Sequence, residues 1–190
     1  MEIGTGQSIS KLSKQILEHI PISVNTKPNI ESADVIILLD TNTIEQLGDI
    51  TEKVSKSSAP LIVVDHHAPH PQTLKRAGLL VTKQETSSTC EVIYDFFKQT
   101  REKPSLKEAE ALFLGIAFDT RHFVLGNAST FEAIVGLCDS GVRPQDTLSL
   151  LSLPMDVSER IARIKACKRA KLFKKGEWII AFSQVSAYEA

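Results

Sequence analysis

Two aliphatic runs, separated by one helical segment, constrain the fold of this chain most strongly. Residues 33–40 and 61–64 are rich in Val, Ile and Leu, a composition typical of strands covered on both faces of a parallel sheet. Residues 43–57 between them have a modest helical pattern. Because such crossover connections are right-handed, the two strands should be near neighbours. The sequence therefore predicts an α/β fold with a parallel sheet and flanking helices.

Polar side chains follow each run at the point where the strand should end. Asp40 comes at the end of the first run, and Asp65, His66 and His67 follow the second. Aspartate and histidine are poor choices for a packed strand but good metal ligands. Since open parallel sheets bind ligands in the crevice outside the carboxyl ends of their strands, we expect both groups to face one crevice.

The other elements are predicted from apolar periodicity, caps and turns. Ser87 or Ser88 is a good N-cap with Glu91 as its capping-box partner, and Ser105 pairs with Glu108 in the same way. We expect helices that begin after these two caps, further helices over residues 9–20, 131–139, 144–151 and 157–171, and strands at 21–24, 79–82 and 177–183.

Composition and charge exclude several classes of protein. A chain of 190 residues is long enough for one well-buried domain with a short appendage, and its net charge of −1 gives no general attraction to polyanions. The longest aliphatic run, residues 35–39, is far shorter than the ~20 residues of a membrane span, so we predict a cytoplasmic protein without a membrane partner. Three widely spaced cysteines indicate reduced core thiols rather than disulfides or a zinc cluster.

Two carboxylates and an imidazole at three predicted element ends form a candidate metal site. Asp40, His66 and Asp119 supply oxygen and nitrogen ligands that suit Mn²⁺, Mg²⁺ or Zn²⁺. Asp119 ends a predicted helix, where the helix dipole opposes an acid, so its carboxylate needs another partner. Taken singly, each residue has a simpler interpretation: Asp40 as a helix cap, His66 as a surface imidazole and Asp119 as the cap of a turn.

Basic side chains near this group have two interpretations each. Arg121 and His122 follow Asp119 closely and could hold phosphate oxygens or serve as ordinary surface residues. The basic run over residues 165–175 is either a solvated helix face or a track for a nucleic-acid backbone.

Several ordered motifs resemble those of one known family. They are Leu38-Leu39-Asp40, Val64-Asp65-His66-His67, the segment 87–91 that opens a helix, and residues 115–123 followed by 127–131. Through them the chain, over most of residues 4–183, resembles a DHH-family phosphoesterase. That group includes RecJ-type single-strand exonucleases, nano-RNase-type oligoribonucleases and family II inorganic pyrophosphatases. An isolated Asp-His-His triplet would be a weak signal, whereas several motifs in order are specific.

The resemblance implies a Rossmann-like sheet and a two-metal site that holds Mn²⁺ or Mg²⁺. In the family pattern Asp40 would bridge the ions, and His66 and Asp119 would complete one of them. His67 would contact the scissile phosphate as a catalytic residue, and Asp65 would orient the histidines.

The resemblance also implies the reaction and its partners. Metal-activated water would hydrolyse phosphodiester or phosphomonoester bonds, as in a manganese-dependent, exonuclease-like phosphoesterase. Arg121, His122 and Ser88 are the expected substrate-binding residues. The expected partner is a nucleotide or a short single-stranded nucleic acid, and a homodimer is left open.

Two departures from the family pattern shape further expectations. The first family motif, His-x-Asp-x-Asp, is expected just before Gly4, where this chain has Met1-Glu2-Ile3, so we expect one bound ion rather than two and weak hydrolysis. We expect a DHH domain over residues 1–157 and, over 158–190, a linker helix with the start of a second α/β domain. The alternatives are a catalytically impaired nucleotide-binding or regulatory module and, less favoured, an inorganic pyrophosphatase.

Overall fold

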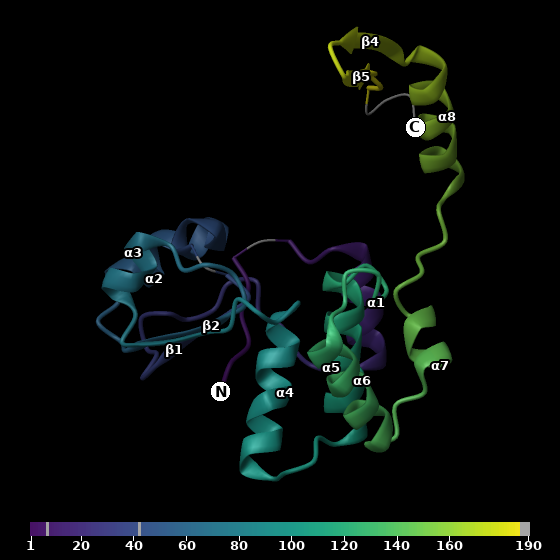
Figure 1. Cartoon of the computed structure of the whole chain (residues 1–190). Coiled ribbons are helices and arrows are strands. Elements are labelled where there is room, and N and C mark those ends of the chain that lie inside the picture. The colour runs from purple at the N-terminus through teal and green to yellow at the C-terminus, as the bar shows by residue number, and fades with distance from the viewer. Residues whose placement is uncertain (7, 42, 187–190) are drawn as a thin grey trace. The chain divides into compact units, whose positions relative to one another are not determined.

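The computed structural model describes residues 1–6, 8–41 and 43–186. The chain divides into two compact units, Met1–Ser152 (unit 1) and Leu153–Ala190 (unit 2) (Figure 1). All the residues proposed above for the candidate site belong to unit 1. The boundary expected at residues 157 and 158 stays a prediction.

Unit 1 is built on a three-stranded parallel sheet. Its strands are β1 (Ile36–Leu39), β2 (Leu61–Asp65) and β3 (Leu79–Thr82), in the order β1-β2-β3. The register pairs Leu39 with Val64, so β1 and β2 finish side by side at the same edge. This arrangement confirms the predicted α/β fold and the adjacency of the two aliphatic runs.

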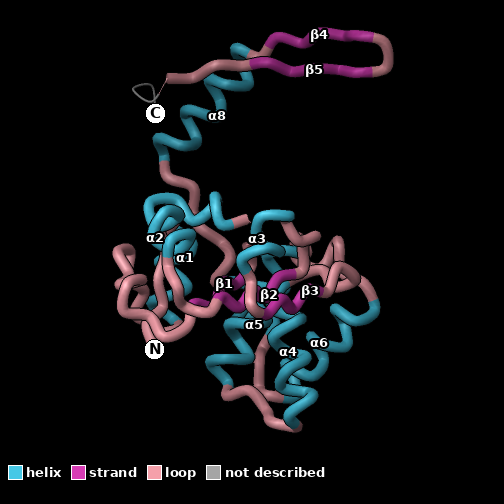
Figure 2. Tube along the Cα trace, turned by 90° about the vertical axis from the view of Figure 1, so that its left-hand side faces the viewer, coloured by secondary structure: helices cyan, strands magenta, loops and turns pink. Residues whose placement is uncertain are grey.

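Helices flank the sheet and form two apolar cores. The helices are α1 (Lys11–His19), the 3₁₀ helix η1 (Ile44–Ile50), α2 (Thr51–Lys56), α3 (Pro71–Arg76), α4 (Thr89–Thr100), α5 (Leu106–Asp119), α6 (Ala128–Asp139) and α7 (Pro144–Ser149). In Figure 2, α2 and α3 lie on one side of the strands and α4, α5 and α6 on the other. One core joins the sheet to η1 and α2 around Val54, Leu61 and Val63, and the other joins α4, α5 and α6 around Phe113 and Leu137.

Strand β1 is covered on one face only, which corrects the prediction of a strand buried on both faces. Ile36 and Leu38 are buried, whereas Ile37 and Leu39 are more than half exposed. An aliphatic run reports the tendency to form a strand, but the number of covered faces depends on which helices pack there. The predicted strand at residues 21–24 is also wrong, because the structure has only an isolated parallel bridge between Gly4 and Asn25 at this point.

Local capping chemistry explains where several helices begin. Ser88 caps α4, and Ser105 forms the predicted capping box with Glu108 at the start of α5. The helix expected at residue 131 begins at Ala128 instead, because Asn127 and Thr130 make a capping box of their own. The two prolines and His70 predict a loop over residues 68–73, but helix α3 already begins at Pro71, and His70 caps it.

The helix predicted over residues 43–57 is interrupted. Gly48 takes the backbone angles φ 61° and ψ −127°, which no α-helix accommodates, so a 3₁₀ segment precedes the short helix α2. The break turns the crossover between β1 and β2 into two short pieces. Both contribute to the core under the sheet, through Ile44 and Val54.

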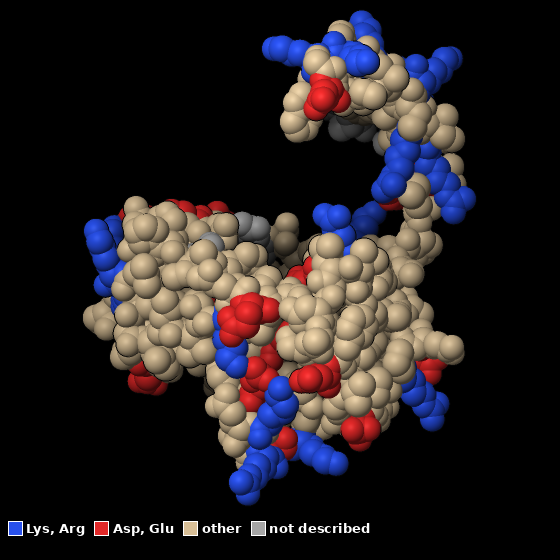
Figure 3. All heavy atoms as spheres, in the orientation of Figure 1, with Lys and Arg blue, Asp and Glu red and all other residues tan. Residues whose placement is uncertain are grey.

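Unit 2 consists of a helix and a two-stranded antiparallel hairpin. Helix α8 (Val157–Arg169) leads into β4 (Lys171–Lys175), which pairs with β5 (Trp178–Phe182). The prediction extended the helix to Lys171 and missed β4, because a lysine-rich segment carries little strand signal. Unit 2 holds 8 Lys or Arg against 4 Asp or Glu, so it is basic, and Figure 3 shows these cations over its surface.

None of the helices within the described part of the chain is both long enough and apolar enough to cross a membrane.

Candidate metal centre

Asp40 stands where β1 ends, in a left-handed backbone conformation that glycine adopts freely and that asparagine and aspartate adopt more often than other residues. Its φ is 58°, in the left-handed region, which costs an aspartate about 1 kcal/mol or more. A hydrogen bond to strand β2 stabilises this conformation: the Asp40 N–H donates to the Val64 carbonyl at 3.1 Å. The Thr89 hydroxyl, on α4, donates to Asp40 Oδ1 at 2.7 Å.

Asp65, the last residue of β2, is fully buried and orients His67. Its Oδ1 accepts hydrogen bonds from the His67 backbone N–H at 2.9 Å and from His67 Nδ1 at 2.8 Å. Because Nδ1 is then the donor, the proton of the neutral ring is fixed there and Nε2 keeps its lone pair. The second carboxylate oxygen, Oδ2, is buried and finds no hydrogen-bond partner among the described residues.

His66 joins the two strand ends. Its Nε2 lies 3.7 Å from Asp40 Oδ1, and its ring centroid is 3.9 Å from that of His67. Asp40, Asp65, His66 and His67 each offer one ligand atom, and these atoms all lie within 4.8 Å of one another. Carboxylate oxygens and imidazole nitrogens so close together are a donor set that fits a divalent cation.

Asp119 lies at the end of α5, and the charges of the same group act on its carboxyl. Burial raises the pKa of Asp119 above its ordinary value, and the charge of Asp40 raises the pKa further, whereas His66 and His67 lower it. Asp119 is not one of the four residues whose ligand atoms lie within 4.8 Å of one another. A cation near Asp40 would favour the charged form of Asp119.

Arg121 and His122 follow Asp119 in an unusual left-handed turn. Arg121, His122 and Phe123 have φ values of 51°, 57° and 71°. The buried Thr120 holds this turn, because its hydroxyl donates to the Ile116 carbonyl at 2.6 Å and accepts from the Phe123 N–H at 3.0 Å. Both basic side chains are exposed.

Ser88, predicted to bind substrate, is fully buried. Its Oγ accepts from the Glu91 N–H at 3.2 Å and donates to Glu91 Oε1 at 3.3 Å. The hydroxyl thus serves the cap of α4, and we assign no substrate contact to it. The sequence analysis assigns no role to the next residue, Thr89, although Thr89 lies in the motif over residues 87–91.

Comparison with known proteins decides the family. Residues 5–116, more than half of the chain, match the model of the DHH family, N-terminal domain. The chain belongs to the DHH family.

Relatives of this DHH chain come from archaea and bacteria. An uncharacterized protein of Methanocaldococcus jannaschii is 33% identical over 186 residues, which are 98% of this chain and 55% of the relative. The cyclic-di-AMP phosphodiesterase GdpP of Geobacillus thermodenitrificans is 29% identical over 146 residues, 75% of this chain and 21% of that protein. The chain therefore spans about half of the archaeal relative and a fifth of the bacterial one.

A solved structure shares the fold of the DHH chain. The crystal structure of an exopolyphosphatase-related protein from Bacteroides fragilis superposes with a TM-score of 0.74 at 20% identity, over 90% of this chain and 53% of that one. At this identity the likeness shows the fold alone.

Cys90 lies beside the carboxylates of the DHH chain but is not suited to bind a metal as a thiolate. Burial, followed by the charges of Asp119, Asp40 and Glu91, raises the pKa of the Cys90 thiol to about 12. The sulfur packs closely on α5, where a Cβ added to Gly115 would lie 2.2 Å from Sγ. The thiol stays protonated at neutral pH and fills space between α4 and α5.

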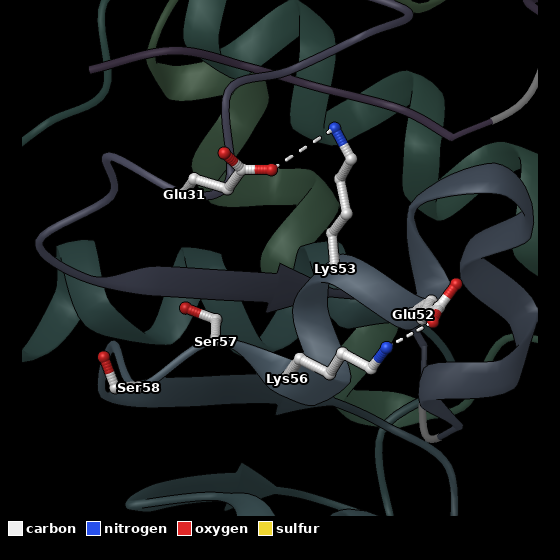
Figure 4. A pocket seen from close by; sticks show the side chains of 6 residues that line it. All are labelled: Glu31, Glu52, Lys53, Lys56, Ser57 and Ser58. Carbon is white, nitrogen blue, oxygen red and sulfur yellow. Dashed lines mark hydrogen bonds and ion pairs between the residues drawn. The ribbon is translucent and has the colours of Figure 1, made fainter.

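A separate hollow of about 390 Å³ lies near the amino end of β2. Figure 4 shows its lining, in which Lys53 points toward Glu31 and Lys56 toward Glu52. The lysines are thus paired with carboxylates from the same lining. This hollow does not contain any of the residues predicted for the site.

Proposed function

We propose that this DHH chain is the core of a metal-dependent phosphoesterase that acts on nucleotides or short single-stranded oligonucleotides. The observation that carries the proposal is the group of carboxylate and imidazole ligand atoms at the ends of β1 and β2, within 4.8 Å of one another. The relatives named as cyclic-di-AMP phosphodiesterases support cleavage of a phosphodiester bond.

Asp40, His66 and Asp119 are the proposed ligands of the cation, which we take to be Mn²⁺ or Mg²⁺. Such an ion, when bound, lowers the pKa of a water molecule and offsets the negative charge that develops on phosphate. Asp40 and Asp119 contribute negative charge. Burial and, after it, the charge of Asp40 raise the pKa of Asp119, and a cation would offset the repulsion between the two carboxylates. His66 adds a neutral nitrogen donor beside Asp40.

His67 is the proposed catalytic contact to the scissile phosphate. Its side chain is 55% exposed, while Asp65 beneath it is fully buried and holds Nδ1. The Asp65 carboxylate holds Nδ1, so the Nε2 side of the ring is left free to meet a phosphate oxygen. We assign Asp65 to the orientation of this imidazole.

The substrate class is proposed from charge and position. Arg121 and His122 directly follow the segment that carries Asp119, and their exposed cationic or hydrogen-bonding groups suit the remaining phosphates of a nucleotide. The basic character of unit 2 supports a polyanionic substrate.

The test is hydrolysis in the presence of Mn²⁺. We expect the chain to cleave bis(p-nitrophenyl) phosphate, a cyclic dinucleotide or a short single-stranded oligonucleotide faster than pyrophosphate. His67→Ala should lower the rate about 10²- to 10³-fold, the usual cost of one charge-stabilising donor. His70→Ala is the matched control, because His70 caps α3 and is not in the ligand group.

Two outcomes would contradict this proposal. Equal rates for His67→Ala and the unaltered chain would exclude the catalytic role of His67. Nucleotide binding without any turnover would support the impaired regulatory module instead, and preferential cleavage of pyrophosphate would support a pyrophosphatase.

A further inference from the structure

A threonine on a different element reaches the proposed metal ligand at the end of β1. Thr89 is the first residue of α4, is 5% exposed, and donates from its hydroxyl to Asp40 Oδ1 at 2.7 Å. We propose that Thr89 is a positioning residue that fixes the Asp40 carboxylate for the divalent cation. This inference rests on the proposed function, because it presumes that Asp40 binds the metal.

The Asp40 carboxylate needs such support, because the sheet fixes the backbone of Asp40 but leaves much of its side chain in solvent. The backbone is fixed by the hydrogen bond from the Asp40 N–H to Val64, but 51% of the side chain is exposed. An exposed carboxylate samples several rotamers and loses that freedom when it binds a ligand. A hydroxyl held on Oδ1 removes much of the freedom in advance, so less conformational entropy is lost on binding.

A buried polar network fixes the start of α4, which carries Thr89. Glu91, 3% exposed, accepts from the Thr130 hydroxyl at 3.1 Å and from the Ser88 hydroxyl at 3.3 Å. Ser88 also caps the helix through the Glu91 N–H. Because Thr130 belongs to α6, the first turn of α4 is anchored to a second helix. The position of Thr89 is therefore set by the fold and not by a bound ligand.

A partner in this position tunes a metal site without touching the metal. The hydrogen bond from Thr89 fixes one oxygen of Asp40, and this leaves the second oxygen and the remaining lone pair of Oδ1 available for a cation. Loss of an outer partner of a metal ligand typically weakens metal affinity about 10- to 100-fold. We expect an effect of this size from Thr89.

The experiment compares Mn²⁺ affinity among four chains. Thr89→Val keeps the shape of the side chain and removes the donor, so the dissociation constant should rise about 10- to 100-fold. Thr89→Ser keeps the hydroxyl and should retain most of the affinity. Thr100→Val makes the same chemical change at the exposed end of α4 and should leave the affinity unchanged. The readout is the electron paramagnetic resonance signal of free Mn²⁺ during titration, with circular dichroism as a check of folding.

The outcomes separate this inference from the proposed function. If the unaltered chain does not bind Mn²⁺, the proposed function fails and the positioning role fails with it. If the unaltered chain binds Mn²⁺ and Thr89→Val binds it equally well, the positioning role alone is wrong. An equal loss in Thr89→Ser would also contradict the hydrogen-bond account. Should Thr89→Val fail to fold, Thr89→Ala carries the same test, because alanine is the best helix former.

Discussion

Replacing Asp40 by asparagine is expected to abolish Mn²⁺ binding and hydrolysis and to leave the fold intact. An asparagine would keep the shape of the side chain, and it tolerates the left-handed backbone at φ 58°. Its amide would also keep a carbonyl oxygen for the Thr89 hydroxyl. The substitution removes the negative charge of Asp40 at the end of β1, so the loss of affinity should exceed the 10- to 100-fold expected for a supporting partner.

The measurement is Mn²⁺ titration and phosphodiester hydrolysis of Asp40→Asn beside a matched control. Asp34→Asn makes the same change at an exposed aspartate that precedes β1, so it should bind and hydrolyse like the unaltered chain. Unchanged Mn²⁺ affinity in Asp40→Asn would show that the ion binds elsewhere.

Phe113→Ala is expected to lower the free energy of unfolding by about 3–5 kcal/mol. Phe113 is completely buried on α5, and its ring meets that of Phe123 edge-on, with a centroid distance of 5.5 Å. The substitution leaves a cavity in the core shared by α4, α5 and α6. A domain of this size has about 5–15 kcal/mol of stability in total, so the loss would affect a large share of it. Because α5 also carries Asp119, the site should lose order as well.

Urea unfolding measures this prediction, with Phe118→Ala as its control. Phe118 is on the same helix but is 61% exposed, so its removal should change stability by no more than about 0.5 kcal/mol. Equal losses in the two variants would mean that the core is not where the structure places it.

Local signals in the sequence predict much of unit 1. The aliphatic runs predict β1 and β2, and their order along the chain predicts that Asp40 and Asp65 finish at one edge. The cap at Ser105 predicts the start of α5, because its bonds join residues only three apart. These features depend on neighbours in the sequence, so periodicity and capping preferences reveal them.

Features that depend on distant contacts were not predicted. The hydrogen bond from Thr89 to Asp40 joins residues 49 apart, and no local pattern indicates it. The single covered face of β1 depends on how the helices pack against the sheet. Residues 171–175 pair with β5 as a strand although their lysines suggested helix.

The candidate site also combines residues that local sequence signals predict with an arrangement that depends on distant contacts. The sequence indicated Asp40, His66 and Asp119, but the group whose ligand atoms lie within 4.8 Å combines Asp40 and His66 with Asp65 and His67. Side-chain distances of this kind follow from strand register and rotamers, which composition does not report. Ser88 was assigned to substrate from its motif, and its burial in the cap of α4 became visible only in the fold.

The most direct test of the metal centre is the anomalous scattering of manganese in crystals grown with Mn²⁺. We expect a peak in contact with the carboxylates of Asp40 and Asp119 and with the imidazole of His66. Absence of a peak at these residues, or a peak only at a distant carboxylate such as Glu31, would contradict it.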